Sequence, residues 1–383
     1  MARDSKGRFD SVSRRKFIVA AGTSGGVALA GCSGGGNDNS GGGNANTATD
    51  APTTATPAAD KNSKQTASSS SSKWSNLLSA GGSSTVYPIT SDGASYWNYN
   101  APTSDQEHWP NKKYGIDTDL PFADYWASTA GYDADGDKGT LPWHVAVGLS
   151  HSGVGLSKVK AGQVDIGDAS APVTAEMPDH DQAYYDKFVN HVVGIDAMQI
   201  SVSRSIYDAG VKQLTKEEVV QVYSGQVENW KDLGGPDKDI QCVGRVEGSG
   251  TRTIFHERML DGGKAPGVDV HKGENQQVAS TVANSDNAIG YLAWAFVGDK
   301  NPAIDLKVGS EVYSQQNDNL GKKSYPLNRD LHCYTYEGTS PMASAFLNMI
   351  ISDMGQDMLV KKHNYITLPD SRQKEEKKKL NLK

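Results

Sequence analysis

Apolar residues along this chain of 383 residues fall into short runs that alternate with segments of helical spacing. Runs of four or five residues predict strands at 164–167, 191–195, 198–202, 240–243 and 331–335. Helical spacing predicts helices at 215–223 and 341–359, and Thr215 with Glu218 forms the pattern of a capping box at the start of the first. Strands that alternate with helices in this way predict an α/β architecture.

Residues 245–252 (RVEGSGTR) predict a turn that leads directly into a helix. Apolar residues at 254, 255 and 259 continue the helical spacing, and the Gly-Gly pair at 262–263 offers an end. The first N–H groups of a helix have no partners within it, and the helix dipole makes this end partly positive. The same pattern also suits an ordinary capped helix behind a tight turn, so the side chains decide between the two interpretations.

These side chains favour a site for a small oxyanion. Gly248 and Gly250 let the backbone come close to a ligand. Ser249 and Thr251 add hydroxyl donors, and Arg245 adds a forked, charged donor from the preceding strand. Together with the helix start they predict anion binding. The segment is not a P-loop, because no Lys follows the second glycine.

Three further segments have the same character. Residues 82–88 (GSSTVYP) and 150–155 (SHSGVG) are Gly/Ser turns before predicted helices, and 165–172 (DIGDASAP) is a strand that ends in small polar residues. Each alone is weak, because Ser and Gly cap helices in all kinds of protein. Four hydroxyl-rich turns at strand ends can nevertheless converge on one ligand.

The N-terminus has the features of an export signal with a lipid anchor. Arg14 and Arg15 begin a twin-arginine motif, a modest apolar stretch follows at 19–30, and residues 29–32 (LAGC) form a lipoprotein processing site. We expect residues 1–32 to be the signal, with Cys32 lipidated; the alternative is that Cys32 is an ordinary small residue of a cleaved signal. Residues 33–73 are rich in Gly, Ser, Asn, Thr, Ala and Pro, which predicts a disordered tether.

Charge argues against binding to nucleic acid. Removal of residues 1–32 takes away six of the 38 basic and two of the 45 acidic residues, which leaves 32 against 43 and a net charge of −11. A body this acidic does not attract anions over long distances, because salt screens remote charges. An anion site here therefore depends on oriented donors at short range.

Residues 96–143 are rich in aromatic and turn residues, and we interpret them as an insertion with a local core. Residues 133–139 (DADGDKG) resemble the start of a calcium loop, but Lys138 stands where the glycine belongs and His144 where the final Glu belongs, so we expect no metal. Cys242 and Cys333 are either a disulfide pair or two small buried residues. The charged tail, 371–383, reads as a solvated helix end or a disordered extension.

No motif of an enzyme is complete. Glu247 and Thr251 occupy the positions where a G-x-S-x-G nucleophile elbow around Ser249 requires glycine. His256-Glu257 lacks the second histidine of H-E-x-x-H, because residue 260 is Leu, and the nine histidines show no metal-ligand spacing. We expect neither catalytic activity nor a cofactor.

Taken in order, the four turns resemble the PstS family, the phosphate-binding proteins of phosphate ABC importers. Further matching stretches are 192–196 (VVGID), 223–230 (YSGQVENW), 288–291 (AIGY) and 365–369 (YITLP). The resemblance covers roughly residues 78–370 and is interrupted by the aromatic insertion. The combination of Ser-Gly-x-x-x-Asn-Trp with Arg-x-x-Gly-Ser-Gly-Thr is its most specific part.

The resemblance implies a two-lobed α/β structure, the periplasmic-binding-protein type II fold, with the ligand in the cleft between the lobes. The first lobe would comprise residues 74–194 and 325–370, and the second 195–324. Hinge closure of the lobes would bury the anion. The phosphate-binding residues implied by the matching motifs are Ser84, Thr85, Val86, Ser152, Ser170, Arg245, Ser249, Gly250 and Thr251.

Two positions depart from the family pattern. Ser170 stands where many members have an Asp that accepts the proton of hydrogen phosphate, and Val154 stands where a hydroxyl residue is common. Asp168 has the wrong strand alternation to replace that Asp, and we expect Glu247 to pair with Arg245. Rejection of sulfate is therefore expected to be weaker.

The resemblance implies an exported solute-binding protein, a monomer that captures inorganic phosphate at the outer face of the cytoplasmic membrane. It would be lipid-anchored there and deliver phosphate to an ABC import permease, with no role in nucleic-acid binding. One alternative keeps the fold and binds sulfate, molybdate or tungstate. Another, of a different class, is a phosphatase or hydrolase.

Overall fold

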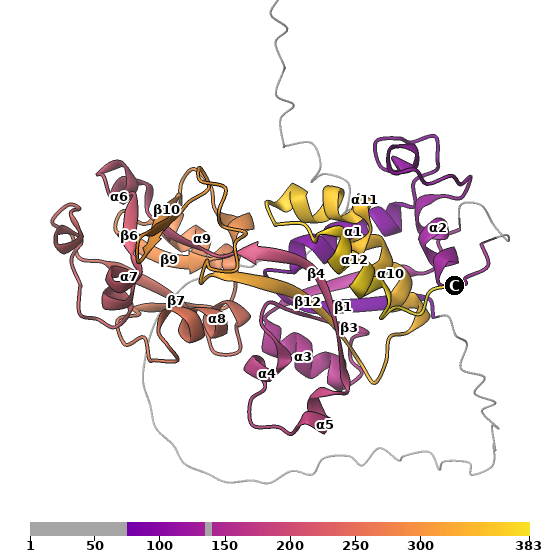
Figure 1. Ribbon diagram of the computed structural model, residues 1–383, viewed down its shortest axis with the longest axis horizontal. Coiled ribbons are helices and arrows are strands. Elements are labelled where there is room, and N and C mark those ends of the chain that lie inside the picture. Colours follow the sequence, from indigo (N-terminus) through magenta and orange to yellow (C-terminus); the bar gives the residue numbers. More distant parts are fainter. Residues whose placement is uncertain (1–74, 135–139) are drawn as a thin grey trace, which may run out of the picture. The chain divides into compact units, whose positions relative to one another are not determined.

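The computed structural model describes residues 75–134 and 140–383. The predicted signal with Cys32, the tether and the centre of the calcium-like loop lie outside the described residues. Two mixed sheets organise this part of the chain, and we call each sheet with its helices a lobe (Figure 1). Within the described residues, no helix is both long and apolar enough to cross a membrane.

The first lobe is built on a five-stranded sheet of order β2-β1-β3-β12-β4. Its strands are β1 (Leu77–Ser83), β2 (His144–Ser150), β3 (Ile166–Ala169), β4 (Phe188–Ala197) and β12 (Asn328–Tyr336). Its helices are α1 (Tyr87–Tyr99), α2 (Phe122–Thr129), α3 (Ser152–Lys160), α4 (Val173–Glu176), α5 (Gln182–Tyr185), α10 (Pro341–Ile351), α11 (Asp353–Gly355) and α12 (Asp370–Lys377). Short helical turns are η1 (Asn111–Tyr114), η4 (Gln356–Val360) and η5 (Lys361–His363).

The second lobe is built on a sheet of order β11-β10-β5-β9-β7-β8, with β6 paired to β10. Its strands are β5 (Gln199–Val202), β6 (Gln213–Thr215), β7 (Gln241–Arg245), β8 (Val270–Lys272), β9 (Ala288–Leu292), β10 (Ala303–Val308) and β11 (Glu311–Tyr313). Its helices are α6 (Arg204–Asp208), α7 (Lys216–Tyr223), α8 (Gly250–Met259) and α9 (Asn275–Asn284), with the turns η2 (Trp230–Leu233) and η3 (Trp294–Phe296). The predicted capping box of Thr215 and Glu218 is confirmed.

The chain crosses between the lobes at two neighbouring places. It leaves the first sheet after β4 and returns to it at β12, and the Met198 amide donates to the Leu327 carbonyl at 2.9 Å. Because β4 and β12 pair antiparallel, with Ala197 opposite Asn328, the two crossings lie side by side. Two adjacent extended segments of this kind are suited to act as a hinge.

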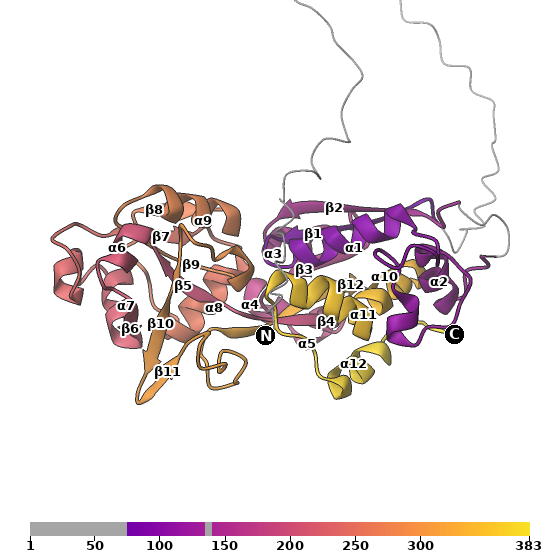
Figure 2. The same cartoon turned by 90° about the horizontal axis from the view of Figure 1, so that it is seen from above.

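The aromatic insertion contributes to the main core of the first lobe. Trp97, Trp109 and Trp143 are almost completely buried, and the rings of Trp97 and Trp143 lie 5.0 Å apart. Phe346 of α10 packs on Trp97 at 6.0 Å. Figure 2 shows α1 alongside β1 and β2 in this region. The prediction of a core rather than a binding surface is confirmed, but this core is continuous with that of the sheet.

The single helix predicted at 341–359 is wrong, because the chain divides it at Ser352. This residue is extended (φ −65°, ψ 160°), and its hydroxyl accepts from the Gly355 amide at 3.1 Å. Gly355 permits the tight path, since a Cβ there would lie 2.1 Å from the Met349 carbonyl oxygen. The Ser-x-x-Gly cap therefore restarts the helix in a new direction.

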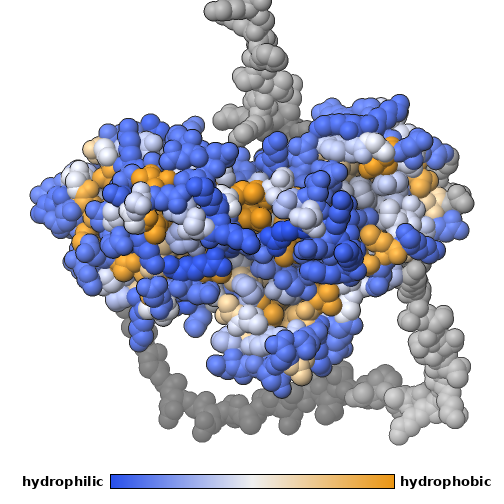
Figure 3. Space-filling model, viewed as in Figure 1, coloured by the Kyte–Doolittle hydropathy of each residue, from blue (hydrophilic) through white to orange (hydrophobic). Residues whose placement is uncertain are grey.

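The charged tail is more ordered than its composition predicts. It forms α12, whose Glu376 is buried and accepts from the Val192 amide at 3.0 Å, and Leu380 is also buried. The segment packs on the first lobe through one face, which carries its buried side chains Gln373, Glu376 and Leu380. Elsewhere the visible surface is mainly hydrophilic, with apolar residues in small separate patches (Figure 3).

Candidate functional site

The predicted turns of the first lobe meet at one edge of its sheet. β1 runs parallel to β2 and β3, with Ser83 opposite Ser150 and Gly82 opposite Asp168. The carboxyl ends of the three strands are therefore level, and the turns that follow each of them lie next to one another. This is the edge where ligands bind in open α/β sheets.

The second lobe brings the start of α8 to the same place. The hydroxyls of Thr85 and Thr251, one from each lobe, lie 3.4 Å apart. A Cβ on Gly250 would lie 2.6 Å from the hydroxyl oxygen of Ser152 and 2.7 Å from that of Ser170. The predicted site residues with side chains are all at most 2% exposed: Ser84, Thr85, Val86, Ser152, Ser170, Arg245, Ser249 and Thr251.

Several of the predicted residues form hydrogen bonds within their own turns. Ser249 is the N-cap of α8, and its hydroxyl accepts from the Arg252 amide at 3.5 Å. The Val86 amide donates to the Ser83 carbonyl at 3.1 Å, and the Val86 side chain packs in the core of the first lobe. The Thr85 amide also has a partner in this turn, the Ser83 hydroxyl at 3.2 Å.

Arg245 is a buried cation with neutral partners. It ends β7, and its guanidinium donates to the carbonyls of Lys272 (3.2 Å) and Gly273 (2.7 Å) and to Oδ1 of Asn275 (3.0 Å). It also reaches the Ser84 hydroxyl of the other lobe at 3.5 Å. Burial lowers the Arg245 pKa to about 10, so the group stays charged at neutral pH.

The expected pairing of Glu247 with Arg245 is wrong. Glu247 is exposed beyond the turn, and none of the ion pairs among residues 75–134 and 140–383 involves Arg245. A buried charge without a counter-ion is unfavourable, so this guanidinium is suited to attract an anion.

Arg329 is the functional candidate that sequence reasoning missed. It lies near the start of β12, is 2% exposed, and pairs with Asp196 at 3.0 Å (Nε) and 2.8 Å (Nη2). Its remaining N–H groups donate to the hydroxyls of Thr251 (3.1 Å), Thr85 (3.1 Å) and Ser170 (3.2 Å). The available signal was an arginine beside an apolar buried strand, a position that requires polar partners.

Asn275 was also missed. It is fully buried at the start of α9, and its side-chain amide donates to the hydroxyls of Ser84 (3.1 Å) and Thr85 (2.9 Å). Its backbone amide donates to Ser84 as well, at 3.2 Å. Nothing in the local sequence distinguishes it from an ordinary residue of a helix start.

These contacts orient the hydroxyl groups. A serine or threonine hydroxyl has one hydrogen to donate and two lone pairs that accept. The Thr85 oxygen accepts from both Asn275 and Arg329, and the Ser84 oxygen from both Asn275 and Arg245. The arginine and asparagine groups can only donate in these bonds, so the hydroxyl hydrogens are left for an acceptor; the Thr251 oxygen, 3.4 Å from that of Thr85, is the longer alternative for Thr85. The site thus combines hydroxyl donors with two guanidiniums, Arg245 and Arg329, and one carboxylate, Asp196. Its net positive charge and its donors favour binding of an oxyanion.

Asp168 does not supply an acceptor to this set. Its carboxyl accepts from the Thr90 hydroxyl at 2.9 Å and from the Cys333 thiol at 3.4 Å, inside the first lobe. Burial raises the Asp168 pKa to about 7. The expectation that strand alternation turns it away from the position of Ser170 agrees with these contacts. Cys333 and Cys242 are both buried free thiols.

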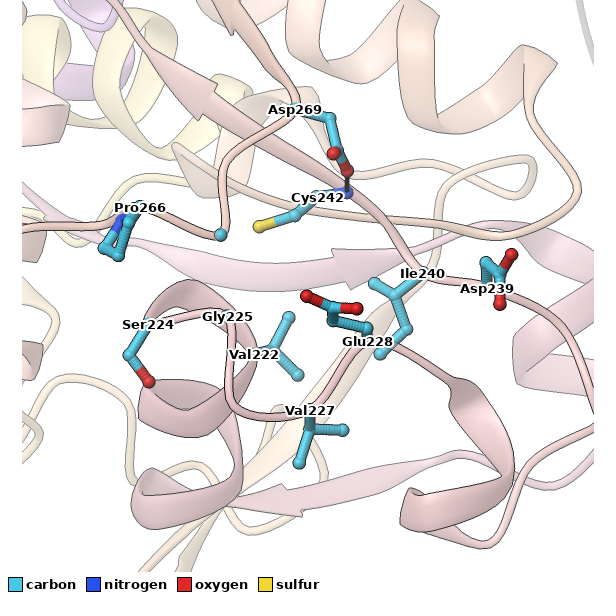
Figure 4. Close-up of a pocket in the computed structure, with 11 residues that line it drawn as sticks. Val222, Ser224, Gly225, Val227, Glu228, Asp239, Ile240, Cys242, Pro266 and Asp269 are labelled. Atoms are coloured by element: carbon cyan, nitrogen blue, oxygen red, sulfur yellow. Dashed lines mark hydrogen bonds between the residues drawn. The ribbon is translucent and has the colours of Figure 1, made fainter.

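A second hollow, of about 560 Å³, lies wholly in the second lobe (Figure 4). Glu228, Asp239 and Asp269 contribute carboxylates to its wall, and Asp269 accepts from the Cys242 amide at 2.8 Å. An anion would be repelled there. The stretch 223–230 lies beside this hollow, and its Trp230 is buried with Nε1 bonded to the Asn287 carbonyl at 2.8 Å. That stretch therefore serves the fold of the lobe. Among the described residues no group of His, Cys, Asp and Glu has the geometry of a metal site.

Comparisons with known proteins identify relatives of this chain. Residues 118–354 match a model of the PBP superfamily domain. Over 227 residues, 59% of this chain and 72% of the relative, the sequence is 32% identical to the phosphate-binding protein PstS of Bacillus subtilis. It is 24% identical over 235 residues to the protein of the same name from Staphylococcus aureus, which covers 59% of this chain and 70% of that relative.

Solved structures confirm the fold. The chain resembles a putative phosphate ABC transporter substrate-binding protein from Clostridium perfringens, solved with bound phosphate, with a TM-score of 0.57 and 23% identity. The match covers 77% of this chain and all of that structure. The predicted α/β, two-lobed periplasmic-binding-protein fold is thus confirmed.

Proposed function

We propose, on the premise that the chain belongs to the PstS family of phosphate-binding proteins, that it captures inorganic phosphate outside the cytoplasm and delivers it to the permease of an ABC importer. The observation that carries this proposal is the buried Arg245 guanidinium, which has neutral partners in its own lobe and reaches the Ser84 hydroxyl of the other lobe. A phosphate dianion supplies the countercharge and the acceptors that this arrangement lacks.

We assign the binding role to the predicted donors and add one residue. Ser84, Thr85 and Thr251 would donate hydroxyl hydrogens. The anion would be surrounded by Ser152 at the start of α3, Ser249 and Gly250 at the start of α8, and Ser170 directly after β3. Arg245 and Arg329 would supply charge from opposite sides. Val86 could contribute only its backbone N–H, which would have to exchange the Ser83 carbonyl for the anion. Lobe bounds of 74–194 with 325–370 and of 195–324, hinged near Met198 and Leu327, are part of the proposal.

Calorimetric titration of the purified protein tests this function. We expect one phosphate to bind per chain, with molybdate and tungstate far weaker and chromogenic phosphate esters left intact. Binding of molybdate in preference to phosphate would favour the alternative oxyanion carrier. Turnover of an ester would instead support the hydrolase alternative.

The same titration, repeated with sulfate, tests selectivity for phosphate over sulfate. The Ser170 hydroxyl is neutral and already accepts from Arg329, so it is a weaker acceptor for the proton of hydrogen phosphate than a carboxylate would be. Ser170→Asp introduces a carboxylate that accepts the proton of hydrogen phosphate and repels fully ionised sulfate. We expect the variant to increase the ratio of phosphate to sulfate affinity by about tenfold, the value of one charged hydrogen bond. Equal ratios in variant and parent would contradict this role.

Localisation follows from the N-terminal pattern. We propose export by the twin-arginine route and a lipid on Cys32 that holds a monomeric body at the outer face of the cytoplasmic membrane. Cys32→Ser should release the protein from the membrane fraction or leave its precursor uncleaved. Normal retention of a processed form would argue against lipidation.

A further inference from the structure

Glu176 is a buried carboxylate that the proposed phosphate site does not use. It is the last residue of α4, and both of its carboxylate oxygens are inaccessible to solvent and have no hydrogen-bond partner among the described residues. The unfavourable burial of an unpaired carboxylate calls for an explanation, because such groups are normally hydrogen-bonded or neutral.

The carboxylate lies where the two lobes touch. α4 belongs to the first lobe and packs against α8 of the second, with Thr253 facing Glu176. A methyl group on Gly153 would lie 3.6 Å from Oε2 of Glu176 and 3.4 Å from the Gly248 backbone. Next to it the Gly153 amide and the His151 ring both contact the Gly248 carbonyl, at 3.0 and 2.9 Å. Glu176 is therefore covered by the closed arrangement of the lobes.

The charged groups around Glu176 do not stabilise its ionised form enough to offset burial. Loss of solvent raises the Glu176 pKa to about 7, although Thr253 and the charges of Arg329, Arg245 and Arg252 act in the opposite direction. The hollow beside it, which is also lined by His151, Lys158 and Glu247, contains charges of both signs. None of these charged groups pairs with the Glu176 oxygens. The Thr253 hydroxyl interacts with the carboxylate but does not offset its burial.

Asp168 provides a useful contrast. Its carboxyl group is also buried, but its partners Thr90 and Cys333 belong to the same lobe, so lobe movement leaves its surroundings unchanged. Glu176 differs because part of its cover belongs to the other lobe. Separation of α8 from α4 would return its carboxylate to water.

We propose that Glu176 is a proton-dependent latch, so that the lobes close over it when its carboxyl group is protonated, and closing takes up a proton that opening releases. This inference rests on the proposed function, because it concerns the closure that buries phosphate. Phosphate would be held more firmly in acidic surroundings and released more readily as the pH rises.

The sign follows from linkage. In the open form Glu176 is solvated and titrates near its ordinary value of 4.5, whereas in the closed form its pKa is about 7. Below 4.5 both forms are protonated and the latch has no effect. Between these values closing binds a proton, so the contribution of Glu176 to closure falls with each rise in pH. Above about 7 the unfavourable effect is constant.

Calorimetric titration with phosphate, in two buffers of different ionisation enthalpy, tests the latch. We expect the parent to take up about one proton more than Glu176→Gln per phosphate at pH 6, and the difference to fall below about 0.1 at pH 9. The affinity of Glu176→Gln relative to the parent should rise at least about tenfold from pH 5 to pH 7.5. Protonation of phosphate itself affects the parent and Glu176→Gln equally, so it cancels in the difference in proton uptake and in the ratio of affinities.

Glu247→Gln is the matched control. It removes the same charge from the same hollow but from an exposed position, so its proton uptake should equal that of the parent. Equal uptake by parent and Glu176→Gln would overturn the latch. Weaker binding by Glu176→Gln at every pH would also overturn it, because that result indicates direct contact with the anion.

Small-angle scattering separates failure of the latch from failure of the proposed function. If the parent binds no phosphate, the function is wrong, and the ligand-free chain still tests the latch. The parent should then expand between pH 5 and pH 8, whereas Glu176→Gln should keep one radius of gyration. A parent whose radius is independent of pH, with or without phosphate, would contradict the latch.

Discussion

Arg329→Met is expected to lower phosphate affinity at least about 100-fold, since a charge-assisted hydrogen bond contributes about 1.5–3 kcal/mol and several contacts are lost together. The guanidinium supplies charge, and it also fixes the hydroxyls of Thr85, Ser170 and Thr251 so that their hydrogens face the ligand. Without it these hydroxyls are free to rotate. Calorimetric titration measures the loss.

The same substitution should destabilise the protein by about 3–5 kcal/mol, because it leaves Asp196 buried without its counter-ion. Burial raises the Asp196 pKa, whereas the Arg329 charge and the Trp294 amide lower it. The double variant Asp196→Leu/Arg329→Met removes both charges and should recover most of the stability in urea denaturation. It should not recover binding.

Arg372→Met is the control for the loss of an arginine–aspartate pair. Arg372 contacts Asp330 through two hydrogen bonds of 2.8 Å, but both side chains are about one third exposed. Its loss should cost less than about 1 kcal/mol and leave phosphate affinity unchanged. Parent-like affinity in Arg329→Met would exclude Arg329 from the site, whatever its effect on stability.

Gly250→Ala is expected to weaken phosphate binding by a factor of about 100 or more while the second lobe folds normally. The added Cβ would lie 2.6 Å from the Ser152 hydroxyl, 2.7 Å from the Ser170 hydroxyl and 3.0 Å from the Ala171 backbone nitrogen. Those atoms belong to the first lobe, so the clash would keep the two lobes from closing. Alanine is itself favourable in a helix, so α8 loses nothing locally.

Two measurements on Gly250→Ala distinguish a closure defect from misfolding. Calorimetry should show the lost affinity, and scattering should show that phosphate no longer contracts the molecule. Gly148→Ala is the control, because a Cβ there would lie 3.9 Å from the nearest atom, the Ala80 carbonyl oxygen. Normal contraction of Gly250→Ala on phosphate addition would mean that the lobes do not approach as closely as the structure shows.

Prediction from sequence was strongest where local chemistry sets the outcome. The capping box of α7, the strands with continuous apolar runs and the turn before α8 depend on residues within a few positions of one another. The break at Ser352 was missed because the apolar spacing continues across it, and only the close approach of Gly355 to the preceding carbonyls reveals the change of direction. The tail was misjudged because its burial depends on a surface of the first lobe that is distant in sequence.

The proposed anion site likewise has features that are local in sequence and features that depend on tertiary contacts. The Gly/Ser turns and Arg245 could be proposed from sequence because a helix start with hydroxyls and a guanidinium is a local feature. Arg329 lies 78 residues from Thr251 and 244 from Thr85, so its contacts with them exist only after β12 returns beside β4. The pairing of Arg329 with Asp196, which lies opposite it on β4, is likewise a result of that return.

By itself, then, the chain determined its alternation of strands and helices, the hydroxyl-rich turns at strand ends and the family to which these belong. Only the tertiary structure decided which charges face the anion, which carboxylates are turned away and which one, Glu176, is buried by the meeting of the lobes. The physical reason is range: hydrogen bonding and helix capping act between neighbours in sequence, whereas desolvation of a charge depends on every segment that packs around it.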